Sequence, residues 1–135
     1  MVKMKIDHLG IAVKNLDESL KFYHKILGLH LKGIEEVKEQ KVRVAFLPIG
    51  DSKFELLEPT DSESPIAKHI EKRGQGIQHI ALRVKDIEAE IERLKKAGVQ
   101  FIGDKPTPGA GGAKIIFIHP KSTNGVLLEL CERPE

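Results

Sequence analysis

The alternation of apolar and polar residues predicts the same set of elements twice along the chain. Residues 5–13 read as a strand whose heavier apolar face is directed to the core, with His8 on the other face. Residues 77–84 repeat this pattern, and His79 stands at the position of His8. Each strand is followed by a lysine, a helical stripe of apolar residues and a glycine. The chain is therefore predicted to contain two copies of one structural unit.

The first copy reads as a strand, a helix and three further strands. The helix is predicted to begin after the N-cap Asn15 and to end at Gly28, with a buried stripe formed by Leu16, Leu20, Tyr23 and Leu27. Strands are predicted at residues 29–37, 41–49 and 53–58, with a tight turn at residues 50–52. These elements make a βαβββ unit.

A polar linker at residues 59–64 leads into a short helix that Ser64 caps and Pro65 begins. The second copy follows with a helix capped by Asp86. Its three strands are predicted near residues 99–102, 113–119 and 125–132, with a flexible glycine-rich segment at residues 106–112. Such a segment beside a stiff sheet is expected to cover or admit a ligand.

We therefore expect an α+β fold in which two tandem βαβββ modules pack side by side into one curved sheet around a metal-binding cavity. At 135 residues the chain fits one domain with a proper core. Its predicted parts are a first module at residues 1–59, a linker helix at residues 60–75 and a second module at residues 76–135.

Composition narrows the classes of function. The chain is 40% hydrophobic and 31% charged, which is ordinary for a folded protein, and a net charge of +2 without basic blocks argues against a nucleic-acid partner. No apolar run is long enough for a membrane span or a signal peptide, so we expect a cytoplasmic protein without a membrane partner. The single Cys131 excludes an internal disulfide and a cysteine-based zinc site.

Both copies end in a strand that carries a glutamate among apolar residues, Glu55 in the first and Glu129 in the second. If the units pack about a pseudo-twofold axis, these carboxylates meet His8 and His79. A buried carboxylate is costly unless it is paired or bound to metal. A lone strand histidine is more often an ordinary polar residue, but the four repeat-related side chains together predict a site for a divalent Co, Mn, Ni, Fe or Zn ion.

The remaining histidines and the cysteine are weaker candidates for a functional site. His24, His30 and His69 lie on or near amphipathic helices, where a solvated position is the simpler interpretation. His119 begins a turn, and lining the mouth of the cavity is as well supported there as a structural role. Cys131 has no neighbour in sequence that would activate a thiolate.

Paired βαβββ units with His, Glu, His and Glu on their strands resemble the vicinal oxygen chelate superfamily. Within it, the chain is similar to the methylmalonyl-CoA epimerase family along nearly its whole length. The matching stretches are residues 6–13, 54–59, 61–68, 77–82, 117–121 and 125–130. The linker at 61–68 and the block at 117–130 are more specific to the epimerases than the two histidine strands.

The resemblance implies a CoA thioester substrate, a metal-stabilised enolate and epimerisation at C2. It assigns His8, Glu55, His79 and Glu129 as ligands of one divalent ion, most typically Co²⁺, with Mn²⁺, Ni²⁺ or Zn²⁺ as alternatives. Glu129 is the expected catalytic base, and a homodimer is implied. The expected substrate contacts are Gly111, Gly112, Lys114 and His119.

The chain departs from the family at one catalytic position, because Val44 stands where several members carry a second glutamate. Glu39, Gln40, Arg43 or a metal-bound water are the open alternatives for the second base. Three other functions also use this fold: a glyoxalase I-like lactoylglutathione lyase, an extradiol dioxygenase and a metal-free binding module. The match in the linker and the C-terminal block favours the epimerase.

Overall fold

The structure is a computed structural model that describes residues 3–134. Its contacts divide into two compact units. We name them the His8 unit, which is His8–Gln78, and the His79 unit, which combines the described residues up to Asp7 with those from His79 onward. Across the described residues, no helix has the length and apolar character needed to cross a membrane.

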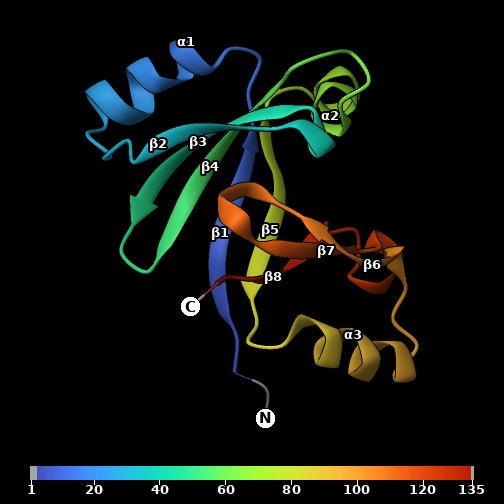
Figure 1. Cartoon of the computed structure of the whole chain (residues 1–135). Helices are drawn as coiled ribbons and strands as arrows, with labels where there is room; N and C mark the ends of the chain where they lie inside the picture. Colours follow the sequence, from blue (N-terminus) through green and yellow to red (C-terminus); the bar gives the residue numbers. More distant parts are fainter. Residues whose placement is uncertain (1–2, 135) are drawn as a thin grey trace. The chain divides into compact units, whose positions relative to one another are not determined.

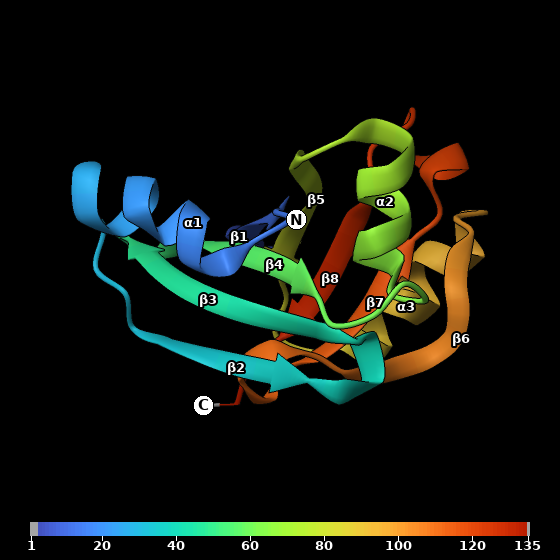
Figure 2. The ribbon, with the colours of Figure 1, turned by 90° about the horizontal axis from the view of Figure 1, so that it is seen from above.

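The His8 unit contains four strands in the hydrogen-bonded order β2-β3-β4-β1. Strand β1 pairs in parallel with β4, whereas β2 with β3 and β3 with β4 are antiparallel. Figure 2 shows β2, β3 and β4 side by side. The elements in chain order are β1 (Lys5–Ala12), α1 (Leu16–Leu20), η1 (Lys21–Ile26), β2 (Gly33–Val37), η2 (Lys38–Gln40), β3 (Val42–Ile49), β4 (Ser52–Pro59) and α2 (Pro65–Arg73).

The His79 unit repeats this plan with the strand order β5-β8-β7-β6. Strands β5 and β8 are parallel, and the other two pairs are antiparallel with an irregular register between Ile102 and Thr107. Its elements are β5 (Gly76–Arg83), α3 (Ile87–Lys96), β6 (Phe101–Pro108), η3 (Ala110–Gly112), β7 (Lys114–Ile118), η4 (Pro120–Ser122) and β8 (Leu128–Glu132). The repeat predicted from the sequence is thus present in the backbone pairing.

In each unit one helix lies over one face of the strands (Figure 1), and the apolar stripe of that helix is buried there. In the His8 unit, Leu16 and Leu20 of α1 pack against Leu47 of β3 and Leu56 of β4. In the His79 unit, a matching cluster joins the helix α3 to β7, β8 and the residue that follows β5 through Val84, Ile87, Ile91, Ile116, Ile118 and Leu130. The helix therefore occupies one face of each set of strands, and the polar positions of the strands are left for the other face.

A glutamate in each unit connects the last strand to the start of the helix. The Glu58 carboxylate accepts a hydrogen bond from the backbone N–H of Leu16 at 2.8 Å, and Glu132 does the same for Ile87 at 2.9 Å. A carboxylate at a helix start satisfies a free N–H group and interacts favourably with the helix dipole. The predicted caps Asn15, Ser64 and Asp86 also accept their expected backbone hydrogen bonds.

The first helix differs from the prediction in its second half. Leu27 was predicted to continue the buried stripe, but its side chain is 52% exposed. After Leu20 the helix continues as a π-helix, with the N–H of Leu27 bonded to the carbonyl of Phe22. Closing each turn over five residues changes the angle between successive side chains, so Leu27 no longer lies above Leu20.

The glycine-rich segment also differs from the prediction. Residues 106–108 belong to strand β6, and residues 110–112 form a short 3₁₀ turn instead of an open loop. Proline and glycine are weak strand formers, so the pairing of Thr107 with Ile115 on β7 decides the structure of residues 106–108 against local propensity.

The second strand of the chain is shorter than the predicted range of residues 29–37, since β2 begins at Gly33.

Two arginines hold a fully buried aspartate at the start of β1. The Asp7 side chain accepts hydrogen bonds from Arg83 at 2.8 Å and from Arg133 at 2.7 and 3.2 Å. The Arg133 guanidinium also donates to the carbonyl of Ala110 at 2.6 Å. In the His79 unit this network joins β1, β5, the 3₁₀ turn and the residue that follows β8.

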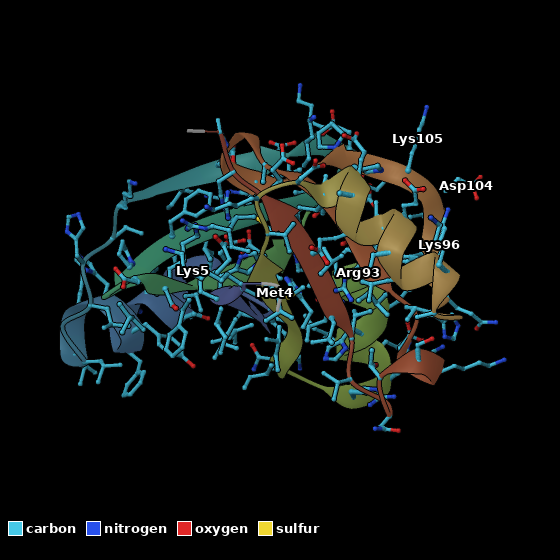
Figure 3. The ribbon with its side chains drawn as sticks, turned by 90° about the horizontal axis from the view of Figure 1, so that it is seen from below. Met4, Lys5, Arg93, Lys96, Asp104 and Lys105 are labelled. Atoms are coloured by element: carbon cyan, nitrogen blue, oxygen red, sulfur yellow. The ribbon has the colours of Figure 1, made fainter. Side chains whose placement is uncertain are left out.

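We expect Asp7→Asn to destabilise the protein by about 3 kcal/mol, because removing one partner of a buried ion pair leaves the other charges uncompensated. Urea denaturation with a metal chelator present measures this loss without a contribution from metal binding. The exposed Asp104, which projects outward in Figure 3, provides the matched control Asp104→Asn. Equal stability of the two variants would contradict a structural role for the Asp7 network.

Candidate metal centre

The parallel pairing of β1 with β4 brings His8 and Glu55 together in the His8 unit. Glu55 lies opposite Gly10, two residues beyond His8 on the same strand and therefore on the same face. Nδ1 of His8 is 3.3 Å from Oε2 of Glu55, and both side chains are buried.

The His79 unit contains an equivalent pair on β5 and β8. Glu129 lies opposite Ala81, which follows His79 by two residues. Nε2 of His79 is 3.4 Å from Oε1 of Glu129, and both side chains are again buried. The two units thus hold the same two residue types at equivalent positions of their paired strands.

A phenylalanine stands opposite the glutamate in both units. Phe46 on β3 pairs with Glu55, and Phe117 on β7 pairs with Glu129. The ring of His79 meets the ring of Phe117 edge to face, with centroids 5.4 Å apart. These rings provide an apolar wall beside each pair, which strengthens electrostatic interactions within it.

The two pairs differ in their cationic surroundings. Nζ of Lys53 approaches Oε2 of Glu55 to 3.7 Å and lies over the ring of Phe46. The repeat places Leu127 at the position that corresponds to Lys53. The lysine is thus a feature of the His8 unit that the His79 unit does not repeat.

The donor set fits a divalent metal ion. Each pair offers one imidazole nitrogen and one carboxylate oxygen, the donors that Zn²⁺ and neighbouring transition metals accept. Two ligands about 2.1 Å from one ion lie roughly 3 Å apart when they are neighbours in its coordination sphere. The separations of 3.3 and 3.4 Å are close to that value. All four side chains also belong to groups that could hold a metal ion.

The position expected to carry a second catalytic glutamate is apolar. Val44 of β3 is 1% exposed and pairs with Leu57 of β4, two residues beyond Glu55. It therefore lies on the same face as Glu55. Arg43 forms an ion pair with Glu58 at 3.0 Å, on the side of β4 that meets α1. A guanidinium remains protonated in proteins, so Arg43 is a poor base.

The predicted substrate contacts have local roles of different kinds. Gly111 and Gly112 adopt positive φ angles in η3, and a Cβ atom on Gly111 would lie 2.7 Å from Nη1 of Arg133. Gly112 and Lys114 line a cavity of about 460 Å³ beside residues 105–108. Nδ1 of His119 accepts a hydrogen bond from the N–H of Lys121 and caps the turn η4.

The other histidines lie outside the two pairs. His24 lies in η1, and its Nδ1 is 2.7 Å from the carbonyl oxygen of Leu29 in the loop that follows. His69 lies on α2, where burial and, secondarily, the charge of Arg73 lower its pKa. Among residues 3–134, no carboxylate forms an ion pair with either of these histidines, in contrast to His8 and His79.

Sequence reasoning missed the network of Asp7, Arg83 and Arg133. A signal for the arginines was present, because each follows a predicted ligand by four residues, and the first unit has Ala12 and Pro59 at the corresponding positions. Contacts between Asp7 and Arg133 span 126 positions in the sequence, and no local pattern predicts such a contact.

Comparison with known proteins places the chain in a family. Residues 5–130 match the Glyoxalase/Bleomycin resistance protein/Dioxygenase superfamily. A hypothetical protein from Bacillus halodurans is 54% identical in its solved structure, with a TM-score of 0.96 over 98% of this chain and 96% of that one. The ethylmalonyl-CoA/methylmalonyl-CoA epimerase of Cereibacter sphaeroides is 38% identical over 93% of this chain and 96% of its own. A variant of Streptomyces coelicolor methylmalonyl-CoA epimerase, solved with 2-nitronate-propionyl-CoA, is 37% identical, with a TM-score of 0.93 over 98% and 96%.

The chain is a member of the glyoxalase and dioxygenase superfamily, whose fold is α+β with paired βαβββ modules in one sheet. Within that superfamily it belongs with the methylmalonyl-CoA epimerases, which are isomerases. The family and the fold class predicted from the sequence are both confirmed.

Proposed function

We propose that this chain is a metal-dependent epimerase that interconverts (2R)- and (2S)-methylmalonyl-CoA. One observation carries the proposal: a buried histidine and glutamate pair occurs at equivalent positions in both units of a chain that is similar to epimerases along nearly its whole length. The reacting carbon of this substrate lies between a thioester and a carboxylate. Its proton is therefore acidic enough for removal by a positioned carboxylate base.

His8, Glu55, His79 and Glu129 are proposed to hold one divalent ion, with Co²⁺ preferred over Mn²⁺, Ni²⁺ or Zn²⁺. The ligand set rests on the equivalence of the two pairs and on donors that suit any of these ions, and the preference for Co²⁺ rests on the resemblance to the epimerase family. When bound, the ion would act as a Lewis acid for the negative charge that develops on the thioester oxygen as the C2 proton leaves.

Glu129 is proposed to be the catalytic base. Of the two buried glutamates, Glu55 has the Lys53 ammonium 3.7 Å from one of its oxygens, and this cation competes with an incoming proton for that oxygen. Leu127 stands at the corresponding position beside Glu129. Glu129 can accept a proton through one carboxylate oxygen while its other oxygen stays in contact with His79.

Inversion at C2 also requires a proton on the opposite face of the substrate. Val44 cannot move a proton, and Arg43 is engaged with Glu58. Glu39, Gln40 and a metal-bound water remain as sources of the second proton transfer.

The second candidate function is a lactoylglutathione lyase. The valine at position 44 favours it, because a lyase that moves a proton between neighbouring carbons on one face of its substrate needs only a single base.

The substrate entrance is proposed to lie beside the turn at Gly111 and Gly112, with Lys114 and His119 nearby. The cavity that Gly112 and Lys114 line supports this placement. The single domain with a linker helix at residues 60–75, the homodimer and the cytoplasmic location stay predictions.

Replacing either paired histidine should release the metal. We expect His8→Ala and His79→Ala to lose most bound metal on dialysis, because each removes one of four ligands. His24→Ala and His69→Ala serve as controls and should retain it. Elemental analysis of the dialysed proteins measures the content. Equal retention in His79→Ala and the parent would refute the proposed ligand set.

Glu129→Gln should suppress exchange of the C2 proton while keeping the shape of the side chain. Loss of a general base lowers the rate by roughly 10²- to 10⁴-fold. Proton NMR of methylmalonyl-CoA in D₂O, started from each epimer, follows the exchange, and a parallel assay with glutathione and methylglyoxal tests the lyase.

The repeat offers Glu55→Gln as the matched variant, which removes a ligand but keeps the base. We expect it to bind metal more weakly. Its rate of proton exchange per bound ion should stay within about tenfold of the parental rate, a smaller decrease than the loss of a general base causes. Parental exchange of both epimers by metal-containing Glu129→Gln would show that Glu129 is not the base.

Val44→Glu should supply the missing carboxylate on the face shared with Glu55. We expect exchange of the slower epimer to rise by at least about tenfold, a modest part of what a positioned base contributes. Val44→Gln is the control, because glutamine has nearly the size and shape of glutamate but cannot accept a proton. Identical exchange rates in these two variants would contradict a base function at position 44.

A further inference from the structure

The His79 unit contains a strongly basic cavity that is lined by none of the four proposed metal ligands. Its volume is about 650 Å³, within the range of small-molecule sites. Five basic side chains and one acidic side chain line it, although the whole chain has a net charge of only +2. They are Lys3, Lys5, Arg83, Lys85, Glu132 and Arg133.

The two arginines of this cavity are held in fixed positions. Asp7 accepts hydrogen bonds from both guanidiniums, whose side chains are 34% and 13% exposed for Arg83 and Arg133. Arginine held in this way loses little conformational freedom when it binds a phosphate, and its planar group matches phosphate oxygens. The aspartate therefore gives the cavity a pre-organised basic floor.

The three lysines extend from the exposed edge of the same cavity. Lys5 and the neighbouring Met4 lie at the start of β1 in Figure 3, away from Lys96 and Lys105. Within residues 3–134, no ion pair to a carboxylate engages Lys3, Lys5 or Lys85. Their ammonium groups are thus available to an incoming anion.

The internal repeat shows that the fold does not require these charges. Arg83 corresponds to Ala12 in the first copy, and Arg133 corresponds to Pro59. Both copies nevertheless form the same strand pairing and the same glutamate bond to a helix start. Binding a ligand is therefore a second role for the arginines, beside their hydrogen bonds to Asp7.

We propose that this basic cavity binds the phosphate groups of an anionic ligand, and that these phosphates belong to the CoA part of the substrate. The second half of this statement rests on the proposed function. Arg83 follows His79 by four residues on β5, about 13 Å along the strand direction, and Arg133 lies just beyond the end of β8, four residues after Glu129. A thioester at the His79 pair could thus extend its phosphorylated end toward the cavity.

Calorimetry on the metal-loaded protein tests the proposal with four probes: CoA, dephospho-CoA, adenosine 3′,5′-bisphosphate and inorganic phosphate. We expect the double variant Lys5→Glu with Lys85→Glu to bind CoA and the bisphosphate at least tenfold more weakly, since each lysine provides a charge-assisted hydrogen bond. Rising salt concentration should also weaken the binding of CoA and the bisphosphate by the parent, because salt screens the attraction between the charges.

Lys21→Glu with Lys96→Glu is the matched control, because it makes the same change of charge at exposed lysines outside the cavity. Weaker binding of CoA in the cavity variant but not in this control supports the CoA source. If dephospho-CoA binds as CoA does and inorganic phosphate alone responds to the cavity variant, the cavity binds free phosphate. Equal binding of all four probes by the parent and the cavity variant overturns the proposal, as does an absence of binding by the parent.

Thermal unfolding of each variant shows that the comparison concerns folded protein. Proton exchange of methylmalonyl-CoA, measured on the same samples, separates the two proposals. A parent that binds the bisphosphate through the lysines but exchanges no C2 proton would refute the epimerase and leave the phosphate site intact. A parent that exchanges protons with unchanged CoA affinity in the cavity variant would do the reverse.

Discussion

The parallel register between the first and last strands of each unit is the constraint on which the candidate site depends. This register places a residue with little or no side chain, Gly10 or Ala81, opposite the glutamate. The histidine two residues earlier then reaches the carboxylate on the same face. A slip of one residue would turn the glutamate toward the helix and separate the pair. The chemistry is thus fixed by backbone pairing before any side chain is placed.

The same register also positions the helix. Three residues after each paired glutamate comes a second one, Glu58 or Glu132, which accepts a hydrogen bond from the helix start. An odd separation along a strand directs the two carboxylates to opposite faces. One strand therefore carries a candidate ligand on one face and a helix anchor on the other. The packing of the apolar core and the geometry of the site are determined together.

The sequence predicts much of this because the relevant signals are local and occur twice. The repeated strand pattern, the caps at Asn15 and Asp86 and the glutamates in apolar strands all follow from residues close to one another. The π-helical turn after Leu20 has no comparable signal, since it depends on how the backbone closes over the core. The path of β6 through Pro106 and Pro108 likewise follows from pairing with β7 and not from propensity. Contacts of Asp7 with Arg133 join the two ends of the described chain, so the repeat could not predict them.

The hydrogen bond from Arg133 to the carbonyl of Ala110 has a consequence for how sequence changes combine. One guanidinium holds both the carboxylate beside the His8 position and the turn that contains Gly111. A methyl group at Gly111 would approach this guanidinium to 2.7 Å, and the φ of +71° also disfavours any other residue there. Changes in the turn and changes at the start of β1 therefore act on a shared partner, and their effects on stability need not add. Among related sequences, we therefore expect the start of β1, the turn that contains Gly111 and the position of Arg133 to change together.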